Sequence, residues 1–215
     1  MKRKSTLPIL RETCRGVCVK RLTNRLGAWH KRRYNTAFSL IELLVVIGVI
    51  IILAGLILST VGYVQKKGAR SRAETEIAAM SAACESYKAD NGIYPRDATT
   101  TDTLNARVSG DPTSTSYQQA SLYLYIQLSG TNADRTPITG ARSYFAFKPN
   151  QLSPSDQAQP VQFIRDPFGN SYGYSTIIAA GGTGGYNPTY DLWSTAGLTT
   201  TPPTATVTAQ WIKNW

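Results

Sequence analysis

The chain has 215 residues, enough for one modest domain with appendages, and a formal net charge of +10. Residues 1–37 carry the whole excess, with 11 Lys and Arg against one acid, whereas the remainder holds 12 basic and 12 acidic residues. This distribution argues against nucleic-acid binding by the body of the protein, which would spread basic residues over a folded face. The one histidine, His30, precedes residue 38, so the rest of the chain has no histidine base or metal ligand, and an enzyme is disfavoured.

Residues 38–58 form a run of about 21 apolar or small residues with a single charge, Glu42. Such a run can cross a bilayer as a helix. It exceeds the apolar region of a cleaved secretory signal, and no A-x-A pattern follows it. The flank before it is more basic than the flank after it, so we expect a cytoplasmic N-terminus and an exported C-terminal part.

The same helix is expected to continue beyond the bilayer, because no proline occurs between residues 38 and 94. Apolar residues then recur at spacings of three and four, which places them on one helix face. They are Ala73, Ile77, Met80, Cys84 and Tyr87. We predict one helix over 38–91, about 80 Å long, that crosses the membrane at about 38–60 and ends before Gly92 and Pro95. Its apolar stripe needs a cover, and residues 93–215 are the candidate within the chain.

Residues 93–215 are rich in Thr, Ser, Gly, Pro and Tyr and read as an exported globular part. Short apolar and aromatic runs between turn residues predict strands at 143–147, 161–164, 172–178 and 189–193. Residues 122–128 alternate as a strand would, but Ala120, Leu124 and Leu128 would also share a helix face, so both structures remain open. The glycine-rich residues 179–188 are expected to form a loop and lack the pattern of a phosphate cradle.

The start of the apolar segment, AFSLIELLVVI at residues 37–47, resembles the start of mature type IV pilins and pseudopilins. In that superfamily a prepilin peptidase cuts before a Phe that is followed four residues later by Glu, and the new amine is methylated. The resemblance implies cleavage between Ala37 and Phe38, methylation of Phe38, and removal of residues 1–37 as a leader. The sequence departs from that pattern in two ways. Ala37 stands where Gly is usual, and we expect this change to slow processing. The leader, at 37 residues, is also long.

Further motifs follow in the order found in that superfamily, and they are most similar to the major (G-type) pseudopilins of type II secretion systems. They are Asn91-Gly92-Ile93-Tyr94-Pro95, then Asp166-Pro167-Phe168-Gly169-Asn170, and then Tyr190-Asp191-Leu192-Trp193-Ser194. The resemblance implies an α+β fold in which one long N-terminal helix packs on a small C-terminal antiparallel sheet. It divides the chain into a leader at 1–37, the helix at 38–92 and an exported domain at 93–215.

The resemblance also implies the protein's setting. The subunit would lie in the inner membrane as a single-pass protein with a periplasmic C-terminal domain, and would then join copies of itself in a pseudopilus. Its partners would be prepilin peptidase, minor pseudopilins, the inner-membrane secretion platform and membrane lipid, with no nucleic acid. Major pseudopilins often bind calcium after the last strand named above. Here the tail after Ser194 has no acid, and Asp191 alone is a poor site, so we expect calcium binding to be absent or weak, and no other cofactor.

Glu42 is costly in hydrocarbon, at about 2.5–3.5 kcal/mol on insertion scales, and therefore calls for a partner. The resemblance supplies the Phe38 amine of a neighbouring subunit, a pairing that would set the register of assembly. The alternative is a glutamate that reaches back to the cytoplasmic interface. The small residues Gly48, Gly55 and Gly62 recur every seven residues and could pack one long helix against another, or could simply reflect the frequency of glycine in membrane helices.

Other functions remain as alternatives at this level. A type IV or competence pilus subunit is the nearest, although the motifs at 91–95 and 166–170 and the lack of a second cysteine to pair with Cys84 favour the secretion branch. A membrane-tethered binding module that holds a polymer through exposed tyrosines or through Trp193, Trp211 and Trp215 belongs to a different class. We expect these tryptophans to lie in the core instead.

Overall fold

The computed structural model describes residues 38–215, apart from the side chains at positions 59 and 60. The predicted leader, including Ala37, lies outside these residues. The chain divides into two units after Gly48, and all the packing described below belongs to the second unit, Val49–Trp215.

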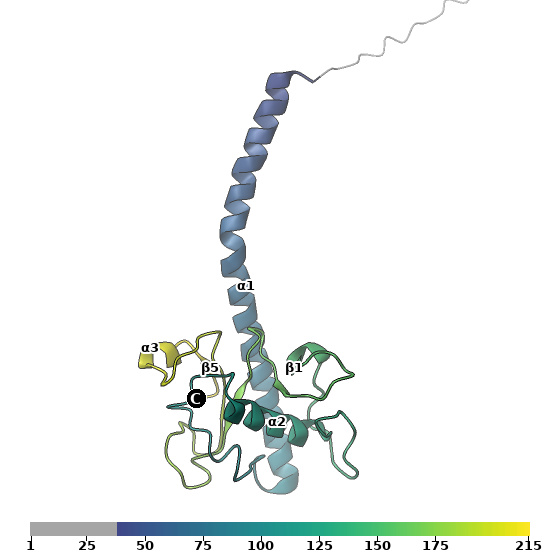
Figure 1. Ribbon diagram of the computed structural model, residues 1–215, viewed down its shortest axis with the longest axis vertical. Coiled ribbons are helices and arrows are strands. Elements are labelled where there is room, and N and C mark those ends of the chain that lie inside the picture. Colours follow the sequence, from purple (N-terminus) through teal and green to yellow (C-terminus); the bar gives the residue numbers. More distant parts are fainter. Residues whose placement is uncertain (1–37) are drawn as a thin grey trace, which may run out of the picture. The chain divides into compact units, whose positions relative to one another are not determined.

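The first element is the predicted long helix, α1, which spans Leu40–Asn91 over 52 residues (Figure 1). It ends as the sequence predicts. Gly92 takes a left-handed conformation with φ of 79°, and its N–H donates to the carbonyl of Lys88 at 2.7 Å. Glycine accepts this conformation without strain, which makes it a common residue just past a helix end. Pro95, three residues beyond Gly92, cannot continue the helix.

The apolar stripe of α1 is covered by the C-terminal part, as predicted. Ala73, Ile77, Met80 and Cys84 are buried, and Tyr87 is half-buried at the edge of the same cluster. One further core residue, Ala83, also lies on α1, and the others lie in residues 124–212. These are Leu124, Tyr125, Leu128, Leu152, Val161, Ile164, Tyr172, Tyr174, Tyr190, Leu192 and Ile212. Burial of this surface is the dominant stabilising contribution to the domain.

The sheets are small and antiparallel. β1 (Leu152–Ser153) pairs with β2 (Phe163–Ile164), preceded by the short 3-10 helix η1 (Pro149–Gln151). A three-stranded sheet has the order β3-β4-β5, with β3 at Gly173–Ser175, β4 at Asp191–Ser194 and β5 at Ile212–Lys213. Tyr174 lies opposite Leu192 and Gly173 lies opposite Trp193. The fold is therefore the expected α+β, pilin-like layout, with one long N-terminal helix and a C-terminal antiparallel sheet.

Both faces of the three-stranded sheet are covered, so every residue of β3 and β4 is buried. Tyr174 and Leu192 belong to the main core with α1, whereas Trp193 belongs to a second core with Trp211 and Tyr117. The Trp193 and Trp211 rings stack at 6.1 Å between centroids. Side chains alternate between the two faces of a strand, which explains why neighbouring large residues in β4 enter different cores.

The open question at 122–128 is resolved in favour of a helix. Helix α2 spans Thr115–Ser129, and the face of Ala120, Leu124 and Leu128 is fully buried. It ends at Gly130, whose N–H donates to the carbonyl of Ile126 at 3.1 Å. Alternation was a misleading signal for a strand because Tyr125, which it placed with Tyr123 on one side, is buried in the main core, whereas Tyr123 is only half-buried.

The strand predicted at 143–147 is wrong. The backbone N–H groups of Tyr144 and Phe145 both donate to the carbonyl of Leu128, at 2.8 and 2.9 Å. Leu128 lies in the last turn of α2, where carbonyls lack partners within the helix. The segment thus satisfies a helix end and does not pair with a strand. The other three predicted strands contain β2, β3 and most of β4, although the observed strands are shorter.

The tail also contains structure that the sequence did not predict. A short helix, α3, spans Ala205–Thr208, and β5 follows it. The Thr204 side chain caps α3 by accepting from the N–H of Val207. β5 then pairs with β4 through Trp193 opposite Lys213 and Ser194 opposite Ile212. The tail therefore completes the sheet.

Candidate assembly site

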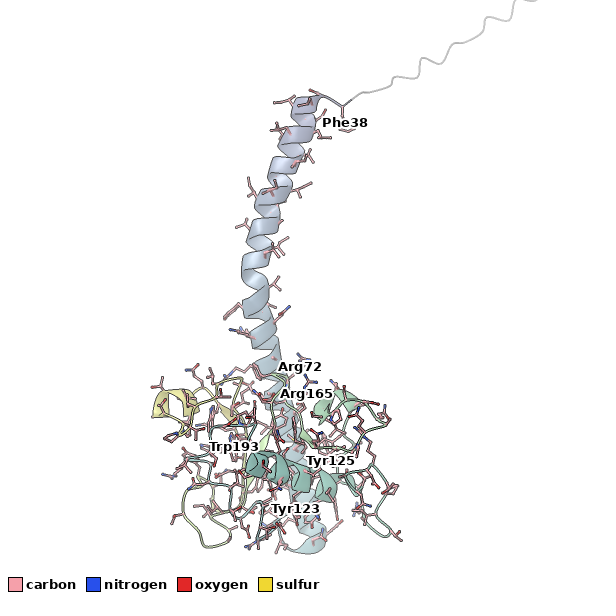
Figure 2. All side chains as sticks on the ribbon, viewed as in Figure 1. Phe38, Arg72, Tyr123, Tyr125, Arg165 and Trp193 are labelled. Carbon is pink, nitrogen blue, oxygen red and sulfur yellow. The ribbon has the colours of Figure 1, made fainter. Side chains whose placement is uncertain are left out.

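The most prominent surface of the described chain is the apolar part of α1. From Val49 to Leu58 each large aliphatic side chain is at least half exposed, and Tyr63 is 71% exposed. Figure 2 shows side chains projecting from α1 between Phe38 and Arg72. A soluble monomer rarely leaves a contiguous apolar surface of this size uncovered. α1 is long and apolar enough to cross a membrane. One such helix among the described residues fits a membrane-anchored, single-pass protein.

The two residues predicted to act in processing and register lie at the start of α1. Phe38 precedes the helix and is 76% exposed. Glu42 lies in the first helical turn, where the helix dipole favours a negative charge. Within residues 38–215, Glu42 forms no ion pair. The structure leaves the carboxylate free for a partner from outside, and its pairing with a neighbouring amine stays a prediction.

The three glycines predicted for helix packing all lie inside α1. A Cβ built on Gly48, Gly55 or Gly62 would meet no atom within 4 Å. No packing inside the described domain therefore requires these glycines. Their role as a contact surface between helices stays a prediction, since small residues allow close helix approach in lipid.

The motif Asp166–Asn170 forms a tight turn between β2 and β3, closed by a buried carboxylate. Asp166 is 3% exposed, and its Oδ1 accepts from the backbone N–H of Phe168 at 3.0 Å and of Asn170 at 2.8 Å. Gly169 has φ of 93°, a conformation for which glycine is suited. The sequence predicted this turn, and the structure shows a closed ring of hydrogen bonds around one side chain.

The same carboxylate also fastens the turn to the sheet. The Ser194 hydroxyl, at the end of β4, donates to Asp166 Oδ2 at 2.5 Å, and both residues are buried. Burial raises the pKa of Asp166, while the hydrogen bonds from Ser194, Asn170 and Phe168 oppose that rise. The nearby carboxylate of Glu76 adds a smaller increase. We refer to the Asp166–Ser194 hydrogen bond as the turn lock.

A second buried carboxylate closes the loop before β4. Asp191 is 1% exposed, and its two oxygens accept from the backbone N–H groups of Tyr186 and Asn187, each at 2.8 Å. Burial raises the pKa of Asp191, while those hydrogen bonds and the charge of Arg107 lower it. The sequence placed Asp191 in a predicted strand and in the motif at 190–194, and as a poor calcium site when taken alone, but did not predict this loop-closing role. The signal for its actual role was the glycine-rich loop just before it, whose N–H groups need acceptors.

Trp193 in β4 and the two tryptophans of the tail, Trp211 and Trp215, have a structural role. Trp193 is fully buried and Trp211 is 2% exposed, which confirms that these two form core. Trp215 is partly buried beside them and stacks on Tyr186 at 4.5 Å between centroids. Trp193 and Trp211 therefore offer no surface for the polymer-binding module considered from the sequence.

Comparison with known proteins gives a limited similarity. A segment of 65 residues is 35% identical to the type II secretion system core protein G of Vibrio cholerae serotype O1. The match covers 30% of this chain and 44% of that protein, so the chain matches less than half of its relative's length. No family model matches the chain, and no solved structure matches it. Together with the fold, the similarity supports a protein of pilin or pseudopilin kind.

Proposed function

We propose that this chain is a structural subunit of a pseudopilus in type II protein secretion. The single observation that carries the proposal is the combination found in α1: an apolar, exposed first part followed by a buried stripe that forms the core of the domain. Such a helix anchors a folded domain to a membrane and offers its other faces to neighbouring helices. The similarity to the Vibrio cholerae core protein G supports the secretion branch over a type IV or competence pilus.

The proposed life cycle has three steps. Prepilin peptidase cleaves between Ala37 and Phe38, and Phe38 is methylated. The subunit then lies in the inner membrane with its N-terminus in the cytoplasm and its C-terminal domain in the periplasm. Finally it joins copies of itself and minor pseudopilins on the inner-membrane platform. Each step uses binding and positioning, and the proposal gives the chain no catalytic role.

Glu42 has the central role in assembly. Its free carboxylate would pair with the Phe38 amine of a neighbouring subunit, inside a medium of low dielectric constant. Removing one partner of such a pair leaves the other charge buried and uncompensated, which is strongly destabilising. Glu42→Gln keeps the size of the side chain and removes only the charge.

The test expresses Glu42→Gln and Glu42→Asp in the host, with Glu74→Gln as the control because Glu74 is exposed on the same helix beyond the apolar segment. We expect Glu42→Gln to accumulate in the membrane as cleaved subunit, with sheared filaments and secretion reduced at least tenfold. Glu42→Asp should be milder, and the control should behave as wild type. Normal filaments with Glu42→Gln would refute the pairing, and absence of filaments from the wild type would refute the proposed function.

A further inference from the structure

A groove of about 650 Å³ lies beside α1, where the apolar segment gives way to basic residues. α1 contributes Tyr63, Lys66, Lys67 and Arg70 to it, and the opposite wall includes Phe168 and Leu198. None of the described residues that line the groove is acidic. The groove thus combines cations with an apolar wall.

The apolar wall is built by two loops that the turn lock holds together. Phe168 belongs to the turn that Asp166 closes, and Leu198 follows a loop in which Ala196 and Gly197 have φ of 53° and 80°. The Ser194 hydroxyl accepts from the N–H of Ala196 at 3.1 Å while it donates to Asp166. Because these contacts are buried or half-buried, the wall is a formed part of the fold.

The three cations of the groove differ in how far their charge is already satisfied. Arg70 donates to the carbonyl of Gln210 at 2.8 Å and lies 3.6 Å from the carboxylate of Glu74. Lys66 and Lys67 are exposed, and neither forms an ion pair within the described chain. Arg70 on α1 therefore already has two partners, and the two lysines remain available to an anion from outside.

The position of the groove along α1 indicates which anion it meets. If the hydrocarbon span ends near residue 60, Tyr63 lies about 4.5 Å beyond it and Lys66 about 9 Å beyond it, at 1.5 Å per residue. Tyrosine is enriched at this interface, and lysine side chains extend back toward it. The headgroup layer is about 5–7 Å thick on each side of the bilayer. The lysine ammonium groups thus reach the level of the lipid phosphates.

We propose that this groove binds the phosphodiester headgroup of an anionic glycerophospholipid from the outer leaflet of the same membrane. Lys66 and Lys67 would contact the phosphate, while Tyr63, Phe168 and Leu198 would cover the glycerol and the first acyl carbons. The inference rests on the membrane anchoring in the proposed function and does not depend on filament assembly. Charge complementarity favours this ligand over a neutral lipid, since the described residues that line the groove include cations and no carboxylate that could pair with a choline group.

The test measures lipid binding to the full chain as single subunits in detergent, by native mass spectrometry during titration with phosphatidylglycerol or phosphatidylcholine. The informative variant is Lys66→Gln with Lys67→Gln. The matched control is Lys88→Gln with Arg142→Gln, which removes the same charge from exposed residues. Lys88 lies about 33 Å further along α1 than Lys66, beyond the reach of the headgroups.

We expect the wild type to prefer phosphatidylglycerol over phosphatidylcholine. The Lys66→Gln/Lys67→Gln variant should lose about 25-fold in phosphatidylglycerol affinity, at about fivefold for each lysine near an anionic surface, with phosphatidylcholine binding unchanged. The control pair and Lys66→Arg/Lys67→Arg should bind as the wild type does. Unchanged near-ultraviolet circular dichroism would show that the variants are folded.

Three results would overturn the proposal. They are equal affinity of the wild type for both lipids, an equal loss in the control pair, and wild-type lipid binding by Lys66→Gln/Lys67→Gln. If that last variant also failed to form filaments, the groove would belong to a contact with a neighbouring subunit. If the chain bound lipid as expected but never formed filaments, the lipid-binding inference would stand and only the proposed function would be refuted.

Discussion

The turn lock predicts a measurable loss of stability when Ser194 is replaced by alanine. The change removes a buried hydrogen bond of 2.5 Å to a carboxylate, together with the acceptor for the N–H of Ala196. Hydrogen bonds to charged groups contribute about 1.5–3 kcal/mol. Asp166 keeps its two backbone donors, so its charge does not become wholly unsatisfied. We expect Ser194→Ala to lower the free energy of unfolding by about 2 kcal/mol, or Tm by about 4–8 °C.

A double-mutant cycle of Asp166→Asn and Ser194→Ala measures the interaction between these two side chains apart from their other contacts. Asp166→Asn retains an oxygen for the N–H groups of Phe168 and Asn170 and removes the charge that Ser194 contacts. We expect Asp166→Asn alone to cost about 1 kcal/mol, because relief of the buried charge offsets the weaker hydrogen bonds. The coupling free energy between Asp166 and Ser194 should be about 1–2 kcal/mol.

The pH dependence follows from the raised pKa of Asp166. Because burial raises that pKa above its ordinary value of 3.8, the folded protein binds a proton more readily than the unfolded chain does. The ionised, buried carboxylate of Asp166 lowers the free energy of unfolding in full at neutral pH. This destabilisation is lost as the pH falls through the pKa that Asp166 has in the folded protein. The wild type should therefore gain stability relative to Asp166→Asn as the pH falls from 7 toward 3.8.

The assay is urea denaturation of the fragment 66–215, followed by tryptophan fluorescence, since Trp193 and Trp211 are buried close to the lock. Ser86→Ala is the control, because Ser86 is exposed on α1 and its hydroxyl bonds only within the helix. We expect that control to change the free energy of unfolding by less than 0.5 kcal/mol. A loss below 0.5 kcal/mol for Ser194→Ala, or a coupling energy near zero, would refute the reasoning.

Three further predictions concern processing, calcium and packing. The mature protein should begin at a methylated Phe38, and mass spectrometry of the membrane fraction would refute this by finding Ala37 retained. The fragment 66–215 should fold as a soluble monomer. A ligand that binds only the folded state raises Tm by mass action, so the weak or absent calcium binding expected here should leave Tm almost unchanged; a calcium-dependent rise of many degrees would contradict this expectation. Gly173→Ala should cost about 1–3 kcal/mol in urea denaturation, since the new Cβ would lie 2.3 Å from the buried Trp193 ring; a wild-type midpoint would exclude that clash.

Several features follow from local sequence alone. The apolar run after Phe38 predicts a helix that crosses a membrane, because its composition is apolar on every face over about 21 residues. The spacing from Ala73 to Cys84 predicts the buried stripe because an α-helix repeats every 3.6 residues. Gly92 and Pro95 predict the end of α1 through their own backbone chemistry. In each case the deciding interactions lie within a few residues along the chain.

Other features were decided only when distant segments met. Residues 122–128 satisfy both the strand and the helix period, and the cores on either side of α2 selected the helix. Strands of two to four residues, such as β1 and β5, are too short to carry a pattern and exist because a partner lies opposite them. The segment 143–147 has strand-like residues but meets a helix end.

The turn at 166–170 and the groove beside α1 are likewise predicted by the sequence only in part. The sequence predicts a turn at Asp166–Asn170, but not that its carboxylate would bind Ser194, which lies 28 residues away. It shows Lys66 and Lys67 after an apolar run, but not the wall of Phe168 and Leu198 that stands beside them. Side-chain type determines what each residue can contact, whereas the path of the whole chain determines which residues come within contact distance.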